Sequence, residues 1–255
     1  MKTEAEVLDD ALIVENLGVH YGQRQAIANV AFVSGWGELI AVIGPNGAGK
    51  STMFKAIAGV VPFDGSIRLG GIECHHGAEQ AHIAYLPQQA DLDRSFPINV
   101  GQLVLSGRRP FLPSWKRPRS ADHQAIDDAL AQVGLSDRRE DPIGSLSGGQ
   151  LQRALVARAL AQEAELLLLD ESLAGVDTPN TLDLLKLFQT LADEGRTILV
   201  ATHDLAIVRR HFSRCLAING TLIADGDPAD VLDADSLEST FGSSEVARYS
   251  VDESA

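Results

Sequence analysis

The chain has 255 residues, of which 45% are hydrophobic and 22% charged, and its formal net charge is −14. This composition is typical of a folded globular protein and argues against disorder. An acidic chain is a poor general binder of DNA or RNA, whose phosphates repel it, so we expect no nucleic-acid partner.

The negative charge is concentrated at the two ends. Residues 1–15 carry five acidic side chains and one basic, and residues 225–255 carry nine and one. The body between them therefore has a net charge of only −2. Two cysteines cannot build a disulfide framework, and no apolar run approaches the roughly 18 residues that span a bilayer. With no secretory signal at its start, the chain is expected to be cytosolic.

Strand-like and helix-like segments alternate along the chain. Strands are expected at 12–21, 28–34 and 39–43, followed by a helix from about 49 to 59 and strands at 66–69 and 82–85. The pattern is then helical with proline-containing breaks from about 90 to 160, and short apolar strands return at 165–169 and 197–201. Such alternation predicts an α/β fold with a parallel central sheet.

A glycine-rich motif of the form G-x-x-x-x-G-K-[ST] lies between the strand at 39–43 and the following helix. Backbone N–H groups of such a loop turn toward phosphate oxygens, and the helix N-terminus adds positive partial charge. We expect Lys50 to reach the β- and γ-phosphates of a nucleotide and Ser51 to offer its hydroxyl to Mg²⁺. The motif alone predicts a P-loop NTPase, which leaves a kinase, a GTPase or a motor open. Its residues are Gly44, Pro45, Asn46, Gly47, Ala48, Gly49, Lys50, Ser51 and Thr52.

Two further segments narrow the choice. The strand at 165–169 leads into Asp170, placed to hold Mg²⁺, and Glu171, placed to orient or deprotonate the attacking water. Ser147, 23 residues before Asp170, is a natural N-cap for an amphipathic helix. The two glycines after it expose N–H groups at the helix start and predict a second anion site. The run that begins this helix is Ser147, Gly148, Gly149 and Gln150.

Together, the loop at 44–52, the LSGGQ run at 146–150 and the LLLLDE run at 166–171 resemble the nucleotide-binding subunits of ABC transporters. The similarity covers nearly all of residues 12–232. It implies an ABC ATPase domain over that range, with a parallel central sheet, an N-terminal antiparallel β subdomain and a helical subdomain at about 90–160. The segments 1–11 and 233–255 are then acidic extensions. The implied cofactors are ATP and Mg²⁺.

The resemblance assigns roles to four more residues. Tyr21 matches the aromatic residue that stacks on adenine, and Gln88 matches the glutamine that contacts Mg²⁺ and the attacking water. Asp177 matches the aspartate of the D-loop, and His203 matches the histidine that contacts the γ-phosphate. One position departs from the family pattern, because Ser172 stands where proline usually follows the catalytic glutamate.

A finer resemblance concerns the transported substrate. The segments 95–100, 107–109, 175–177 and 201–204 resemble those of ATPases from manganese, zinc and iron importers. This likeness implies import of a metal ion or a metal chelate. Iron-siderophore and haem importers have similar ATPases, and an exporter ATPase stays open as an alternative.

The mechanism implied by the resemblance needs several polypeptides. ATP would lie between Lys50 of one chain and Ser147 and Gly149 of a second copy arranged head to tail. The implied partners are this second copy, an integral membrane permease and an extracytoplasmic substrate-binding protein, and the implied location is peripheral, on the cytoplasmic face of the membrane. The alternative of another class is a soluble regulatory ABC ATPase acting on ribosomes or DNA. DNA-repair relatives insert a long coiled coil, and Gly144 follows Lys50 by 94 positions, which is too few for one.

We expect neither a metal site at a cysteine and histidine cluster nor a nucleic-acid surface at a basic segment. Cys74, His75, His76 and His82 show neither C-x-x-C nor H-x-x-x-H spacing, so they do not predict a metal site. The basic residues between 108 and 119 favour a solvated loop near a permease or lipid head groups over a nucleic-acid surface.

Overall fold

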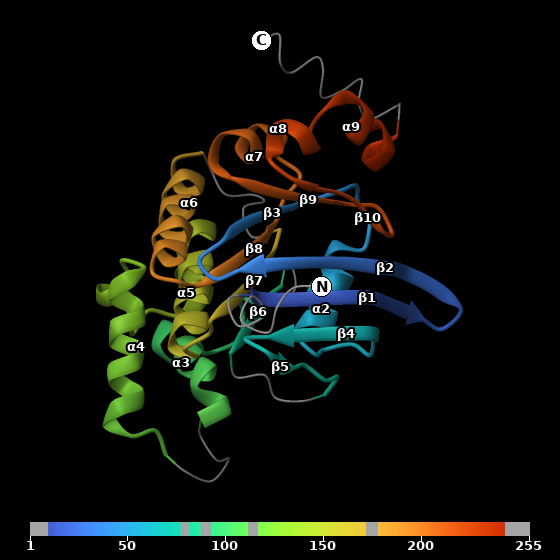
Figure 1. The fold of residues 1–255 in the computed structure, drawn as a ribbon. Coiled ribbons are helices and arrows are strands. Elements are labelled where there is room, and N and C mark those ends of the chain that lie inside the picture. Colours follow the sequence, from blue (N-terminus) through green and yellow to red (C-terminus); the bar gives the residue numbers. More distant parts are fainter. Residues whose placement is uncertain (1–9, 78–81, 88–92, 112–116, 172–177, 243–255) are drawn as a thin grey trace.

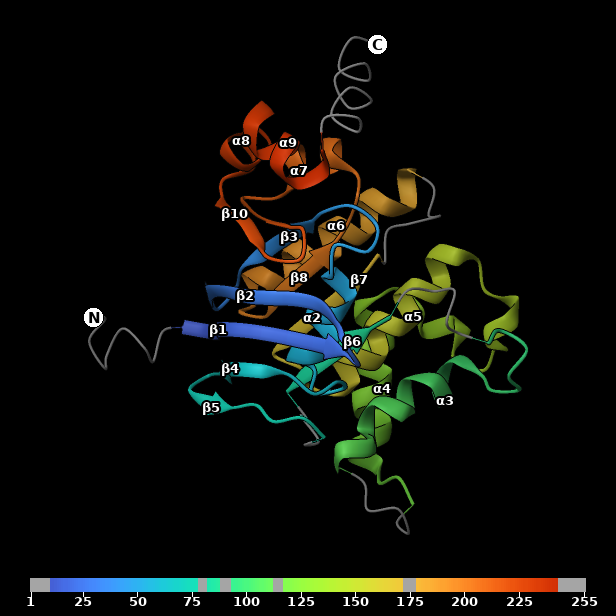
Figure 2. The same ribbon diagram turned by 90° about the vertical axis from the view of Figure 1, so that its right-hand side faces the viewer.

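Two β-sheets and a group of helices form the part of the chain that the structure describes (Figures 1 and 2). The computed structural model describes residues 10–77, 82–87, 93–111, 117–171 and 178–242. No described helix is both long enough and apolar enough to cross a membrane.

The central sheet has the order β10-β9-β3-β8-β7-β6 among the described strands. All neighbouring pairs are parallel except β10 with β9, which are antiparallel. Every residue of β3, β7 and β8 is buried, which explains why these strands are almost wholly apolar rather than alternating. The strands are β3 (Leu39–Ile43), β6 (Ile83–Leu86), β7 (Leu166–Asp170), β8 (Thr197–Ala201), β9 (Arg214–Ile218) and β10 (Leu222–Gly226).

A second, antiparallel sheet lies on one side of the central sheet. Its order is β2-β1-β4-β5. Helix α2 (Lys50–Ile57) packs between the two sheets, where Met53 and Phe54 are fully buried with residues of both. The strands are β1 (Asp10–Tyr21), β2 (Arg24–Gly35), β4 (Asp64–Leu69) and β5 (Ile72–Glu73).

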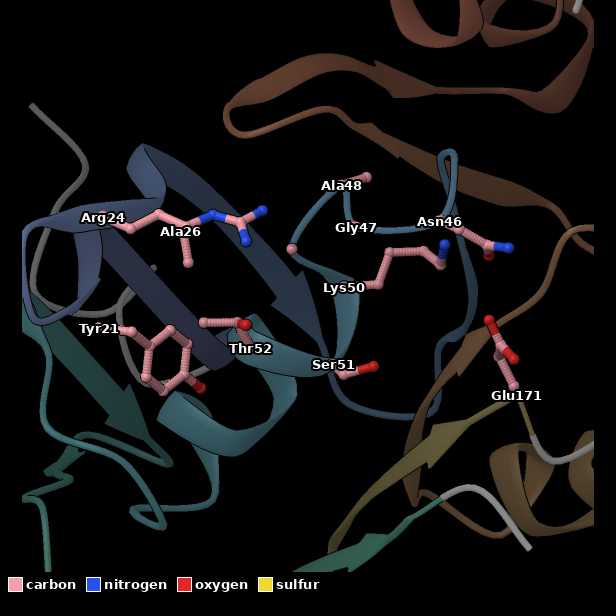
Figure 3. Close-up of a pocket in the computed structure, with 11 residues that line it drawn as sticks. Tyr21, Arg24, Ala26, Asn46, Gly47, Ala48, Lys50, Ser51, Thr52 and Glu171 are labelled. Carbon is pink, nitrogen blue, oxygen red and sulfur yellow. The ribbon is translucent and has the colours of Figure 1, made fainter. Parts of the chain in front are cut away.

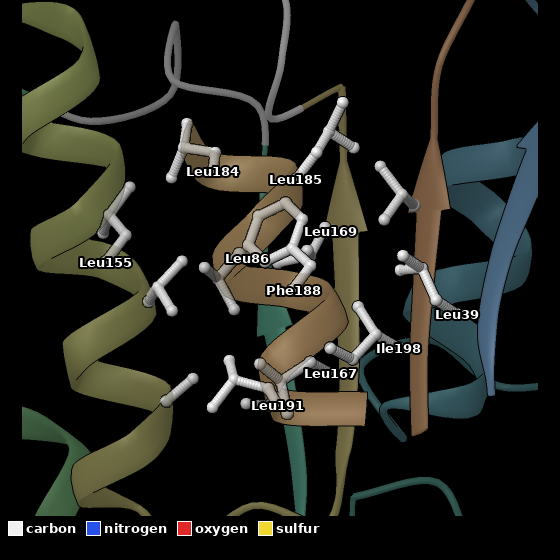
Figure 4. Packing of buried hydrophobic residues seen from close by; sticks show 14 of the residues in the cluster. Leu39, Leu86, Leu155, Leu167, Leu169, Leu184, Leu185, Phe188, Leu191 and Ile198 are labelled. Carbon is white, nitrogen blue, oxygen red and sulfur yellow. The ribbon is translucent and has the colours of Figure 1, made fainter. Parts of the chain in front are cut away.

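The opposite face of the central sheet is covered by helices. Leu155 of α5 and Phe188 of α6 pack with Leu167 and Leu169 of β7 and Ile198 of β8 (Figure 4). Helices α3, α4 and α5 contact one another and form a helical group within the range expected for the helical subdomain. The helices on this side and beyond are α3 (Val100–Leu105), α4 (Ser120–Gln132), α5 (Gly148–Ala161), α6 (Thr178–Asp193), α7 (Leu205–His211), α8 (Pro228–Val231) and α9 (Ala234–Phe241).

The expected α/β fold with a parallel central sheet is confirmed. The C-terminal segment differs from the expectation of an acidic tail from residue 233 onward. Residues 234–241 form α9, which Asp233 caps by accepting a hydrogen bond from the Ser236 amide. Leu237 and Phe241 lie four residues apart on one helical face and are buried in the core. This apolar face holds the segment as a packed helix although its sequence is acidic.

Candidate functional site

The glycine-rich loop joins β3 to α2 at the carboxyl edge of the central sheet. All three of its glycines have positive φ angles: 152° at Gly44, 82° at Gly47 and 99° at Gly49. A Cβ atom at Gly44 would lie 2.1 Å from the carbonyl oxygen of Ile218, and one at Gly49 would lie 2.2 Å from Cγ2 of Ile27. Neither place has room for a side chain, so the tight approach of β9 and β2 requires glycine.

Lys50 is the first residue of α2 and is only 5% exposed. Its ammonium group donates to the carbonyl oxygens of Gly44, at 2.6 Å, and Pro45, at 3.1 Å. Burial lowers the pKa of Lys50, and the carboxylates of Glu171 and Asp170 oppose that shift. The amine is thus held across the mouth of the loop with two acidic side chains near it.

A cavity of about 380 Å³ opens over this loop (Figure 3). Backbone N–H groups at the start of α2, the Lys50 ammonium group and two hydroxyls converge on it, which is the chemistry of an anion site. Figure 3 shows Tyr21 and Arg24 at one end of the cavity and Glu171 at the other, with Lys50 between them. The lining residues are Tyr21, Arg24, Ala26, Asn46, Gly47, Ala48, Gly49, Lys50, Ser51, Thr52 and Glu171.

Tyr21 and Arg24 reach the cavity from the hairpin between β1 and β2. The two residues are cross-strand partners around a tight turn, in which Gly22 has a φ of 61°. Tyr21 lines the cavity and is 49% exposed. Tyr21 is a predicted site residue, whereas Arg24 and Ala26 were not predicted from the sequence. The spacing of three residues around a Gly-containing turn was the signal that could have placed Arg24 beside Tyr21.

Asp170 ends strand β7, which β8 separates from β3, and Glu171 follows it directly. Asp170 is 3% exposed and accepts a hydrogen bond from the Tyr85 hydroxyl at its Oδ2 atom, at 3.0 Å. Its Oδ1 atom is buried and has no hydrogen-bond partner among the described residues. Glu171 has a φ of 47°, a backbone conformation that costs energy for a residue with a side chain. This turn directs Glu171 into the cavity, as Figure 3 shows.

His203 follows β8, the strand between β3 and β7. Ala201 pairs with Val42 on one side and with Asp170 on the other, so the three strands end at one edge. His203 lies two residues after Ala201 and is exposed. It is not among the residues that line the cavity. Asp204 after it caps α7 through the amide of Ile207.

The predicted signature segment lies away from this cavity. Ser147 caps α5, with its hydroxyl 3.2 Å from the Gln150 amide and the Gln150 side chain 2.9 Å from the Ser147 amide. Gly149 packs against Asn180 of α6. None of Ser147, Gly148, Gly149 and Gln150 lines the cavity. The two helix starts that the sequence predicts as anion sites therefore lie apart within one chain.

Three sequence-predicted features lie outside the described residues: Gln88, Asp177 and the departure at Ser172. All four residues of the cysteine and histidine cluster, Cys74, His75, His76 and His82, lie within the described ranges. Cys74 is buried, and burial raises its thiol pKa. Over the described ranges, no three His, Cys, Asp or Glu side chains gather closely enough to hold a metal ion.

The arrangement fits a nucleoside triphosphate with a divalent cation. The loop amides and the Lys50 ammonium group can donate hydrogen bonds to phosphates. The exposed aromatic ring of Tyr21 can stack on a base at the other end of the cavity. The unpartnered Oδ1 of Asp170 supplies an anionic oxygen of the kind that Mg²⁺ prefers. Glu171 lines the same cavity and supplies a carboxylate, a group that can accept a proton from water.

Comparisons with known proteins find relatives among the ABC transporters. The ABC transporter family model matches residues 27–174. The chain is 42% identical to the manganese transport system ATP-binding protein MntB of Halalkalibacterium halodurans, over 89% of this chain and 90% of that protein. It is 40% identical to the chelated iron transport system membrane protein YfeB of Yersinia pestis, over 91% of this chain and 79% of that protein. A solved ABC transporter described as of the metal-chelate type, in an inward-facing conformation, superposes with a TM-score of 0.79 at 30% identity, covering 91% of this chain and 88% of that one.

Proposed function

We propose that this chain, which belongs to the ABC transporter family, is the ATPase subunit that powers import of a metal ion or a metal chelate. Membership of this family makes the chain an ATP-binding and ATP-hydrolysing protein. The cavity that runs from Tyr21 to Glu171 over the glycine-rich loop is the observation that carries the proposal.

Within that cavity we assign roles by position. The loop amides and Lys50 bind the phosphates of ATP, and the ring of Tyr21 stacks on adenine. Ser51 and Asp170 hold Mg²⁺, which would neutralise the phosphate charge. Glu171 takes the proton from the attacking water, a role that typically contributes about 10²–10⁴ in rate. Gln88, Asp177 and His203 complete the site in this proposal, as in the family pattern.

The second anion-binding helix start requires a second copy of the chain. Ser147 and Gly149 do not line the cavity of their own chain, and Ser147 caps the helix whose first turn holds Gly149. A head-to-tail dimer with two-fold symmetry would place each signature helix over the nucleotide of its partner. Each dimer then encloses two ATP molecules, and hydrolysis opens it.

The remaining partners follow from the kind of machine in which such subunits work. We propose a membrane permease as partner, with the chain bound peripherally at the cytoplasmic face, and an extracytoplasmic protein that delivers the substrate. The permease surface would be the segment after β6, from about residue 90 to 105. Part of this segment, at Ile98 and Val100, is hydrogen-bonded to the backbone at residues 141–143, just before the signature. A movement there would therefore reach Ser147.

Manganese is the first candidate for the transported metal, and iron the second. Two relatives with about 90% of this chain aligned are named for manganese and for chelated iron. No described residue of this subunit has to contact the metal, because the permease and the delivery protein would select it.

Cellular metal content tests this proposal. Deletion of the gene should lower cellular manganese, or else iron or zinc, when supply is limiting, and added metal should restore growth. Elemental mass spectrometry measures this directly. Complementation with the Lys50→Ala variant is the matched control, because it supplies the protein without its nucleotide chemistry and should not restore metal content. Unchanged manganese, iron and zinc in a strain without competing importers would refute the metal assignment and leave the ATPase assignment standing.

A further inference from the structure

Tyr85 contacts the acidic residue that we propose as a magnesium ligand. It lies on β6, which runs parallel to β7 with Tyr85 paired to Leu168, two residues before Asp170. The phenol hydroxyl of Tyr85 donates to Oδ2 of Asp170 at 3.0 Å. The two residues are 85 positions apart in sequence, so only the packing of neighbouring strands joins them.

The hydrogen bond leaves the two oxygens of Asp170 in different states. Oδ2 is satisfied by Tyr85, whereas Oδ1 is buried without a hydrogen-bond partner among the residues described. A buried carboxylate oxygen that lacks a partner is costly, and a cation is the ligand that removes this cost. The bond from Tyr85 fixes the plane of the carboxylate, because rotation out of that plane would break the bond.

Tyr85 is itself tied to the helix that begins at the signature. Arg158 of α5 donates to the carbonyl oxygen of Tyr85 at 3.2 Å, and burial lowers the pKa of Arg158. Gln162 at the end of α5 donates to the carbonyl oxygen of Ile83 on the same strand, at 2.8 Å. Strand β6 therefore accepts hydrogen bonds from Arg158 and Gln162, and its Tyr85 donates one to Asp170.

From this geometry we infer that Tyr85 is a positioning residue for the metal site: its hydroxyl holds Asp170 with Oδ1 turned toward the Mg²⁺ that accompanies ATP. The inference rests on the proposed function, since it assumes that Asp170 serves Mg²⁺. Residues that orient metal ligands strengthen metal binding, and their loss typically lowers metal affinity by about 10–100-fold. The role also gives a path from the signature helix through Arg158 and Tyr85 to the carboxylate.

Binding of N-methylanthraniloyl-ATP to the purified full chain, titrated with magnesium chloride, tests this inference. Tyr85→Phe removes the hydroxyl and keeps the ring. We expect the Mg²⁺ concentration that half-maximally strengthens nucleotide binding to rise by about tenfold or more. Affinity in EDTA should stay as in the wild type, because the phenol does not line the nucleotide cavity.

Gln162→Met is the matched control. It removes another hydrogen bond between α5 and β6, one that does not reach Asp170. Thermal unfolding of both variants measures any general loss of stability. We expect a normal Mg²⁺ requirement for Gln162→Met even if its melting temperature falls as far as that of Tyr85→Phe. A folded Tyr85→Phe protein with wild-type Mg²⁺ dependence, or with equally weakened binding in EDTA, would overturn the positioning role.

Asp170→Asn separates this inference from the proposal beneath it. If wild type needs Mg²⁺ and Asp170→Asn does not respond to it, the metal site stands and Tyr85→Phe decides the inference. If wild type and Asp170→Asn respond alike, the magnesium role of Asp170 is wrong and the role of Tyr85 falls with it.

Discussion

The ammonium group of Lys50 bridges the mouth of its own loop, 2.6 Å from the carbonyl oxygen of Gly44. Lys50 is buried, with 5% of its surface exposed. ATP binding would exchange these carbonyl contacts for contacts with phosphate oxygens, which are charged and therefore stronger hydrogen-bond acceptors.

Replacement of Lys50 should therefore weaken ATP binding. Lys50→Ala removes a charge-assisted hydrogen bond worth about 1.5–3 kcal/mol, which corresponds to roughly 10–100-fold in affinity. Hydrolysis should be abolished. Equilibrium binding of fluorescent ATP and phosphate release measure the two effects. Wild-type turnover by Lys50→Ala would remove the phosphate-binding assignment of the loop.

The buried amine also predicts a pH dependence of stability. Burial lowers the pKa of Lys50 in the folded state below the usual 10.5, so the folded protein releases this proton at lower pH than the unfolded chain does. Between those two pKa values the unfolded state binds more protons, and this group's contribution to the free energy of unfolding rises with pH. Urea unfolding without nucleotide, from neutral pH to about pH 10, should show this rise in wild type relative to Lys50→Met. Identical pH profiles would mean that Lys50 does not titrate differently on folding.

Glu171 should separate ATP binding from hydrolysis. Glu171→Gln keeps the size of the side chain and loses the base, so turnover should fall by about 10²–10⁴ while ATP still binds. The protein should then accumulate as an ATP-bound dimer, seen by size-exclusion chromatography with light scattering. A Glu171→Gln protein that stays monomeric at high concentration with ATP would contradict the head-to-tail dimer.

A second helix of the fold begins with the same kind of N-cap as Ser147. Asn99 caps α3 with the same reciprocal pair of hydrogen bonds, to Gln102, that Ser147 makes with Gln150 at α5. Ser147→Ala and Asn99→Ala should each lower the free energy of unfolding by about 1 kcal/mol. Only Ser147→Ala should also lose ATP-dependent dimerisation and hydrolysis, because only that helix start would face the nucleotide of a second chain.

The comparison of these two variants uses chemical unfolding and light scattering on the same samples. Equal loss of dimer in both would show that helix capping alone accounts for the effect. Retained dimerisation in Ser147→Ala would remove the signature from the interface.

The chemical identity of the site was visible in short stretches of sequence. The loop at 44–52, the acidic pair at 170–171 and the capped helix start at 147–150 are each contiguous, and their function depends on local backbone geometry. A tight turn needs glycine and a helix start needs a capping side chain, whatever the rest of the chain does. Buried strands were likewise predictable, because a run such as 39–43 is apolar on both faces.

Only the tertiary structure decided which of these stretches meet. Strand order brings Asp170 and Glu171 to the same edge of the sheet as the loop, with β8 between β7 and β3, and the β1–β2 hairpin brings Arg24 to the same cavity. The same packing keeps Ser147 away from Lys50 within one chain, and it joins Tyr85 to Asp170 across two strands. Contacts of this kind depend on register and on the packing of layers between segments far apart in sequence, and a local pattern carries no information about either.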